Sequence, residues 1–308
     1  MATRYDIYSV ADYLEVLMNF SRYGLDGYRD EMTNLYFRGE PEDYGETAGQ
    51  PGIARGKWLE GDNESELFRE CERRLSHEFV NCKSTFEKLV VMQHYGIPTR
   101  VLDVTMDSLQ ALFFALYHDP KSSYDDTKDS VVLVYEVPKE SVRSWHSDVV
   151  SVISNIAVYN YDNLDIRGLS NSTEEFERTA FNENESIKHL LHEIRAEKTY
   201  FGPWIKKDNM ESVYCVHPLL DNPRIRSQQG AFLLFGMDGD KHHLATLESN
   251  KGPEIRMAKL FIPYCAKARI REELNLLGRT IDTVYPDWTG VSDYFSRFYN
   301  RKPEEYYR

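Results

Sequence analysis

Hydrophobic residues recur at helical spacing in several segments of the chain. Helices are predicted over 9–20, 63–79, 84–93, 109–116, 267–278 and 294–299, with a polar amphipathic helical region over 173–200. Ser9 is placed to cap the first helix, because a serine side chain can accept from backbone N–H groups of the first turn. Gly96 and Pro98 end the helix that begins near Ser84, since neither residue continues a helix well.

Other apolar runs are rich in β-branched and aromatic residues and predict strands. These are "NLYFRGE", "SVVLVYEVP", "SVYCVHP", "GAFLLFG" and "MAKLFIP". Helices and strands do not alternate as regular βαβ units, which favours an α+β fold around a single mixed or antiparallel sheet with flanking helices. The segment 40–57 is rich in Gly, Pro and acidic residues and is expected to be an exposed loop and a candidate lid.

Composition narrows the class of protein. The chain has 308 residues, of which 41% are hydrophobic and 13% aromatic, so it has enough apolar material for a large core. Its net charge of -13 means that the surface as a whole repels nucleic acid and anionic membranes, although a local basic pocket is compatible with that charge. Neither a membrane span nor a signal peptide is predicted, so we expect no membrane partner and a cytoplasmic location.

Cysteine spacing and glycine patterns exclude several common kinds of site. The four cysteines, Cys71, Cys82, Cys215 and Cys265, show no paired short spacing, which argues against a zinc cluster and against a disulfide framework. We expect reduced thiols and no metal site. No Gly-rich phosphate loop of the dinucleotide-binding or P-loop type stands at a strand-to-helix turn.

The most unusual pattern lies between two apolar helices, at residues 93–105. Polar and aromatic side chains interrupt the apolar sequence there at His94, Tyr95, Thr99, Arg100, Asp103 and Thr105. The next helix begins shortly afterwards, with Asp103 or Thr105 available as its cap. A helix N-terminus beside Arg100 would attract an anion such as phosphate. The alternative is a buried ion pair between Arg100 and Asp103 that fixes the turn.

Further candidate residues lie outside this segment. Arg38 stands near the end of a predicted strand beside Gly39, where the missing side chain would let a ligand approach the backbone. Arg38 could equally be a surface charge, and His94 is either a core residue or a catalytic one. Gln228 and Gln229 precede an apolar strand and would point to opposite faces, so we expect one to be functional and the other a solvent or structural contact.

Three stretches in this order resemble the FRG domain, a family named for the triplet seen here as Phe37, Arg38 and Gly39. They are "YFRGE", "QHYGIPTRVLDVTMDSLQALFFAL" and "NPRIRSQQGAFLLFG". The resemblance implies an N-terminal helical segment at 1–30, an FRG domain at 31–268 and a C-terminal helical extension at 269–308 packed on the same domain.

The chain also resembles, more loosely, the ADP-ribosyltransferase superfamily. In that superfamily an arginine ends the first core strand, a Ser or Thr precedes a helix rich in Ala and Phe, and a glutamate stands at a later strand. Arg38, Thr105 and the pair Gln228–Gln229 fall in this order. The resemblance implies a sheet core of that type, NAD as substrate, Arg38 on the NAD phosphates supported by Thr105, and Tyr95 stacked on nicotinamide. The rest of the implied NAD-binding set is Gly39, His94, Thr99 and Arg100.

The sequence departs from the superfamily at the glutamate. That glutamate holds the ribose hydroxyl and favours the positively charged sugar that forms as nicotinamide leaves, whereas Gln228 and Gln229 are neutral. Losing a preorganised electrostatic contact of this kind typically costs about 3 to 4 kcal/mol, or roughly a hundredfold or more in rate. Asp103 would supply the missing charge if it faces the pocket.

Three functions follow from these patterns. The first is an ADP-ribosyltransferase that modifies a nucleic acid or a protein, in the setting of a bacterial toxin or phage defence, with an antitoxin or regulatory partner in prospect. The second is a noncatalytic module that senses a nucleotide or a phage component. The third is an interaction module in which the polar segment 93–105 is entirely structural.

Overall fold

The computed structural model describes most of the chain. It covers residues 4–27, 32–117, 127–161, 163–169, 175–219 and 230–284. The predicted helix at 294–299 and the pair Gln228–Gln229 lie outside the described residues.

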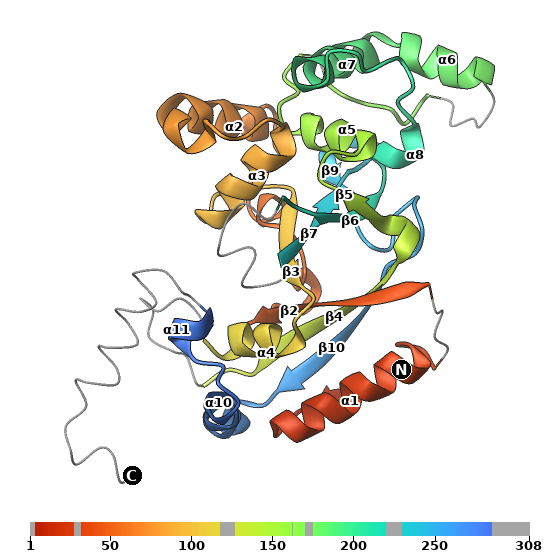
Figure 1. Ribbon diagram of the computed structural model, residues 1–308. Helices are drawn as coiled ribbons and strands as arrows, with labels where there is room; N and C mark the ends of the chain where they lie inside the picture. The colour runs from red at the N-terminus through yellow and green to blue at the C-terminus, as the bar shows by residue number, and fades with distance from the viewer. Residues whose placement is uncertain are drawn as a thin grey trace.

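One eight-stranded mixed sheet organises the fold (Figure 1). In sheet order its strands are β1 (Tyr5–Asp6), β10 (Arg256–Ile262), β4 (Ser130–Pro138), β2 (Thr33–Glu40), β3 (Val101–Thr105), β7 (Gly230–Phe235), β6 (Val213–His217) and β5 (Val142–Ser144). The β1–β10 and β5–β6 pairs are parallel and the others are antiparallel. Together with the helices, this sheet confirms the α+β class. A separate hairpin joins β8 (Met237–Asp238) to β9 (Asp240–Leu244).

The sheet is weakly joined between β2 and β3. β2 pairs with β4 along its whole length, and β3 pairs with β7 along its whole length, but β2 and β3 pair at a single position, Phe37 with Thr105. In Figure 1, β10, β4 and β2 form the lower half of the molecule, and β3, β7, β6 and β5 rise into the upper half. Side chains near Phe37 and Thr105 therefore lie where the two half-sheets part.

Helices flank both halves of the sheet. Their bounds are α1 (Val10–Tyr23), α2 (Asn63–Arg74), α3 (Thr85–His94), α4 (Ser108–Leu116), α5 (Asp148–Ile156), α6 (Glu175–Glu183), α7 (Glu185–Glu197), α8 (Lys207–Met210), α10 (Lys267–Leu276) and α11 (Ile281–Val284). All helices predicted within the described residues are confirmed, and the region 173–200 contains two of them, α6 and α7. Helix α5 is buried along most of its length and was not predicted.

Three clusters of buried apolar side chains hold these elements together. Helices α1, α4 and α10 pack on the lower half-sheet, whereas α2, α3, α5 and α7 pack on the upper half. The third cluster joins the opposite faces of both half-sheets, and the segment 40–57 adds Ala48 to it. Ile53 from the same segment is also buried, and its N–H donates to the Thr99 carbonyl. The prediction of an exposed loop is therefore wrong for these residues.

None of the helices in the described ranges is both long and apolar enough to cross a bilayer.

Candidate functional site

The Phe-Arg-Gly triplet lies on β2, where alternation sends neighbouring side chains to opposite faces. Phe37 is buried in the core beneath α4. Gly39 faces the backbone of the same helix, since a Cβ atom at this position would lie 2.0 Å from the Ala111 carbonyl oxygen and 2.4 Å from the Ala115 nitrogen. Gly39 thus permits close packing of α4, and the expectation that it opens the backbone to a ligand is wrong.

Arg38 points to the other face and contacts two carboxylates. Its Nε donates to Oε1 of Glu40 at 3.2 Å, and its Nη1 lies 2.7 Å from Oδ1 of Asp103. Nη1 also donates to the Asp103 carbonyl at 3.0 Å, just beyond the point where β2 and β3 pair. The Arg38 side chain is 18% exposed, that of Glu40 is 1% exposed and that of Asp103 is 53% exposed. Arg38 therefore bridges a buried carboxylate and a solvent-facing one.

The charges of Arg38 and Asp103 stabilise each other. Burial works against the charged form of Arg38, but the attraction of Asp103 and Glu40 outweighs it and raises the Arg38 pKa. Burial also disfavours the charged form of Asp103 and would raise its pKa. Arg38 and a hydrogen bond from Gln93 outweigh this effect and lower the Asp103 pKa below its usual value. Asp103 is therefore ionised at neutral pH and available as a negative charge in the site.

A polar side chain of α3 fixes the position of Asp103. Nε2 of Gln93 donates to Oδ1 of Asp103 at 3.1 Å, and Oγ1 of Thr99 donates to Oε1 of Gln93 at 3.1 Å. Gln93 was not among the predicted site residues. The signal that could have found it is an amide on the apolar stripe of α3, four residues after the buried Leu89.

Buried polar atoms also lie behind Arg38. Oε1 of Glu40 accepts a second hydrogen bond, from the Gly49 N–H at 3.2 Å, while its Oε2 has no hydrogen-bond partner among the residues that the structure describes. The hydroxyl of the fully buried Tyr135 has none either, and burial raises its pKa. Glu40 was also missed from sequence, although it stands two residues after Arg38 and so shares its face of β2.

Comparison with known families bears directly on these residues. The FRG domain family model matches residues 33–124. Over these residues the chain is similar to the FRG domain family. The match includes β2, α3, β3 and α4, and therefore Arg38, Gln93, Asp103 and Thr105, but it ends before Gln228 and Gln229. Neither the curated proteins nor the solved structures yield a match to this chain.

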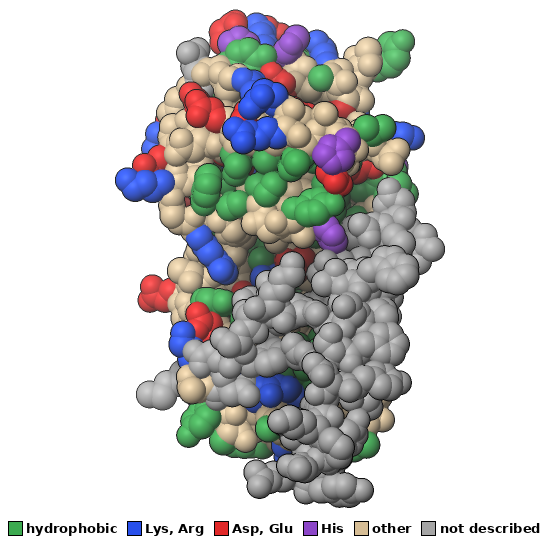
Figure 2. All heavy atoms as spheres, turned by 90° about the vertical axis from the view of Figure 1, so that its left-hand side faces the viewer, with side chains coloured by type: hydrophobic (Ala, Val, Ile, Leu, Met, Phe, Trp, Pro, Cys, Tyr) green, Lys and Arg blue, Asp and Glu red, His purple; other side chains and the backbone are tan. Residues whose placement is uncertain are grey.

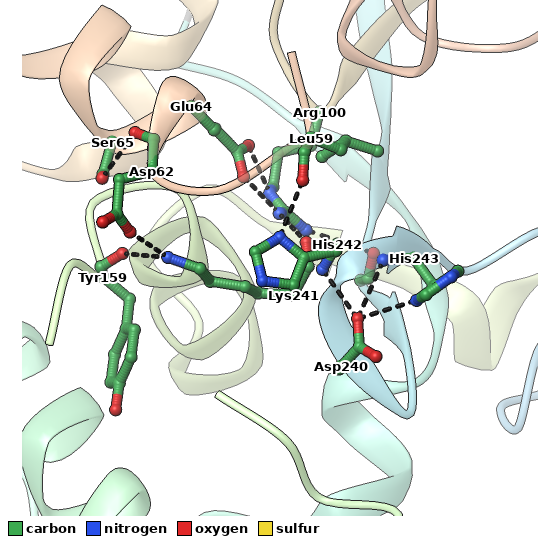
Figure 3. Close-up of polar contacts among 11 residues, drawn as sticks. Leu59, Asp62, Glu64, Ser65, Arg100, Tyr159, Asp240, Lys241, His242 and His243 are labelled. Carbon is green, nitrogen blue, oxygen red and sulfur yellow. Dashed lines mark hydrogen bonds and ion pairs between the residues drawn. The ribbon is translucent and has the colours of Figure 1, made fainter. Parts of the chain in front are cut away.

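Arg100, the other arginine that the sequence singled out, is enclosed by protein. It is 0% exposed, its Nε donates to Oε1 of Glu64 at 2.6 Å and its Nη1 donates to the Gly236 carbonyl at 3.2 Å. Figure 3 shows Arg100 and Glu64 pointing toward one another. The predicted alternative of an Arg100–Asp103 pair is wrong, because Asp103 pairs with Arg38. Arg100 instead ties α2 to the end of β7.

A small cavity beside Arg100 has its charges paired. Nζ of Lys241 lies 2.7 Å from Oδ1 of Asp62 and 3.3 Å from the Tyr159 carbonyl (Figure 3). Nδ1 of His242 contacts the Leu59 carbonyl at 2.7 Å. These contacts join the loop that precedes α2 and Tyr159 to the β8–β9 hairpin, so the cavity belongs to the structural framework of the upper half.

Thr105 and the start of α4 are organised by Asp107. Oγ1 of Thr105 accepts from the Asp107 N–H at 3.0 Å, and the Asp107 carboxylate caps α4 by accepting from the N–H groups of Leu109 and Gln110. Arg279 pairs with the same carboxylate at 2.7 Å. The prediction that Asp103 or Thr105 caps this helix is wrong. A carboxylate already occupies the N-terminus where an anion was expected.

His94 and Tyr95 lie at the C-terminal end of α3 and are exposed. The Tyr95 hydroxyl donates to Oε2 of Glu78 at 3.0 Å. The rings of His94 and Tyr95 meet edge to face, with their centroids 5.2 Å apart. Tyr95 is 57% exposed. Figure 2 shows the surface on the side of α2 and α3 hollowed between its upper and lower parts, with acidic and basic side chains in the hollow and hydrophobic ones above it.

The described residues form no group of three or more His, Cys, Asp or Glu side chains that could hold a metal ion.

Proposed function

We propose that the protein is an NAD-dependent ADP-ribosyltransferase whose site is built around Arg38 and Asp103. The observation that carries the proposal is that these residues, 65 positions apart in the chain, meet at 2.7 Å at a partly exposed position of the FRG domain. A guanidinium and an ionised carboxylate are the two charges that the reaction requires. Arg38 would hold the pyrophosphate of NAD, because guanidinium groups bind phosphate oxygens in pairs.

Asp103 would take the place of the absent glutamate. As the bond between the ribose C1′ and the nicotinamide nitrogen breaks, the electron pair leaves with nicotinamide and positive charge develops on the sugar. A fixed carboxylate nearby lowers the energy of that state. The low pKa of Asp103 keeps it ionised, and Gln93 holds it in place at 3.1 Å. The acceptor of ADP-ribose is proposed to be a nucleic acid or a protein, and a role as toxin or phage-defence effector rests on family resemblance alone.

Nicotinamide release from NAD tests the proposal. Arg38→Lys keeps a positive charge beside the buried Glu40 but loses the fork of N–H donors, so we expect turnover to fall about a hundredfold or more. Asp103→Asn should lower turnover by a similar factor. Its melting temperature should change little, because the Asp103 side chain is half exposed. Asp148→Asn is a matched control, since Asp148 is 60% exposed and lies 2.9 Å from Lys198 on other elements. No nicotinamide release by the wild type with protein or nucleic-acid acceptors would reject the proposal.

A noncatalytic nucleotide sensor is the second candidate, and the neutral pair Gln228–Gln229 favours it. A neutral amide at the position of the superfamily's glutamate gives a hydrogen bond but no charge to stabilise the reacting sugar. Binding of NAD or ADP-ribose without any nicotinamide release, lost in Arg38→Lys, would support the sensor. The absence of a thermal shift with every nucleotide would leave a purely structural role for the segment 93–105.

A further inference from the structure

The two carboxylates that contact Arg38 differ in how firmly they are held. Glu40 is 1% exposed, and its Oε1 accepts from both Arg38 Nε and the Gly49 N–H. Asp103 is 53% exposed and contacts Nη1, at the outer end of the guanidinium. An ion pair that faces solvent is weak because water competes for both partners, whereas breaking a buried pair leaves an uncompensated charge. The outer contact is thus the one that a ligand can replace.

We propose that Asp103 occupies the anion position of Arg38 in the free protein, and that a bound phosphate group displaces Asp103 while Glu40 keeps hold of Nε. This inference rests on the proposed function, in that it takes Arg38 as the phosphate-binding residue. Carboxylate and phosphate oxygens both accept hydrogen bonds from guanidinium N–H groups, so a phosphate oxygen can take the place of Asp103 Oδ1 at Nη1. The ligand class is a pyrophosphate or phosphate ester that approaches from the side of Asp103.

Displacement does not remove Asp103 from the site. In the free protein its Oδ1 also accepts from Nε2 of Gln93, and Thr99 fixes Gln93 through Oε1, so we expect this hydrogen bond to hold Asp103 near the site after displacement. The carboxylate that loses its arginine therefore stays beside the bound ligand with its charge uncompensated. In the free protein the same charge is neutralised by Arg38. Binding of the phosphate thus creates the negative charge that the reaction on the sugar would use.

Isothermal titration of the full chain with inorganic pyrophosphate tests the exchange. Asp103→Asn removes the competing anion, so we expect pyrophosphate to bind about fivefold more tightly than to the wild type, the factor that a partly exposed ion pair contributes. Asp148→Asn removes one equally exposed, paired carboxylate elsewhere and should leave the affinity within about twofold. Adding Arg38→Gln to Asp103→Asn should abolish the tight binding.

Several results would overturn the exchange. These are unchanged or weaker binding to Asp103→Asn, tighter binding that survives Arg38→Gln, and no binding of pyrophosphate to any variant. Asp103→Ser replaces Asp103→Asn in the same comparison if the asparagine variant melts early. Pyrophosphate carries no nicotinamide, so its titration is independent of turnover. Suppose that Asp103→Asn binds pyrophosphate more tightly but the wild type never releases nicotinamide. That result would reject the proposed ADP-ribosyltransferase activity and would still support the displacement of Asp103 by phosphate.

Discussion

The substitution Gly39→Ala tests the structural explanation of the FRG triplet. A methyl group at this position would lie 2.0 Å from the Ala111 carbonyl oxygen and 2.4 Å from the Ala115 nitrogen, which are backbone atoms of α4. Side-chain rotation cannot relieve such contacts, so α4 must move away from β2. Gly39 has no positive φ, and the cost is therefore steric. Overpacking typically costs about 1–3 kcal/mol and occasionally more, and displacement of a helix belongs at the upper end.

A loss of about 3 kcal/mol should lower the melting temperature by roughly 5 °C in a protein of this size. Urea unfolding should give a lower midpoint with an unchanged slope. Gly168→Ala is the matched control, because Gly168 also lacks a positive φ and a Cβ there would meet nothing within 4 Å. Equal stability of the two variants would refute the close packing of α4 on Gly39 and would restore the interpretation of Gly39 as an opening for a ligand.

Two further predictions concern buried polar groups. Arg100→Met should lower the free energy of unfolding in urea by about 3–5 kcal/mol, because it leaves the Glu64 carboxylate without its arginine. Adding Glu64→Leu to the same chain should recover much of that free energy. His217 is partly buried, and its Nε2 lies 2.7 Å from the Tyr36 hydroxyl. Burial lowers the pKa of His217, so its imidazole is protonated at a higher pH in the unfolded chain than in the folded protein. Stability should therefore fall as pH drops through about 6.5, and His217→Gln should flatten that part of the stability curve.

Most helices and the fold class could be predicted because they depend on local patterns. The capping box at Ser84 and the apolar stripe that follows specify α3 without any long-range information. Helix α5 was missed although Asp148, Ser151 and Asn155 recur at helical spacing, because the β-branched residues between them are typical of a strand. The segment 40–57 was predicted to be exposed because it is rich in Gly and acidic residues. Two of its apolar residues, Ala48 and Ile53, nevertheless enter the core.

The site was harder to predict than the fold. Arg38 and Asp103 were each singled out from sequence, but their contact depends on the sheet order that places β2 beside β3. Arg100 was the nearer partner for Asp103 in sequence, yet the packing of α2 buries Arg100 against Glu64 instead. Sequence neighbours within one polar segment can therefore have opposite roles, and only burial separates the structural arginine from the candidate functional one.

The position of Arg38 follows from the constraints on its two neighbours. Phe37 anchors β2 in the core below α4, and Gly39 lets α4 lie directly on the strand, so the side chain between them must point to the opposite face. Asp103 belongs to the other half-sheet, which β3 joins to β2 at a single pair. The Arg38–Asp103 contact consequently links two half-sheets that share few backbone hydrogen bonds. A phosphate that takes the place of Asp103 would weaken this link, which ties occupancy of the site to the junction of the sheet.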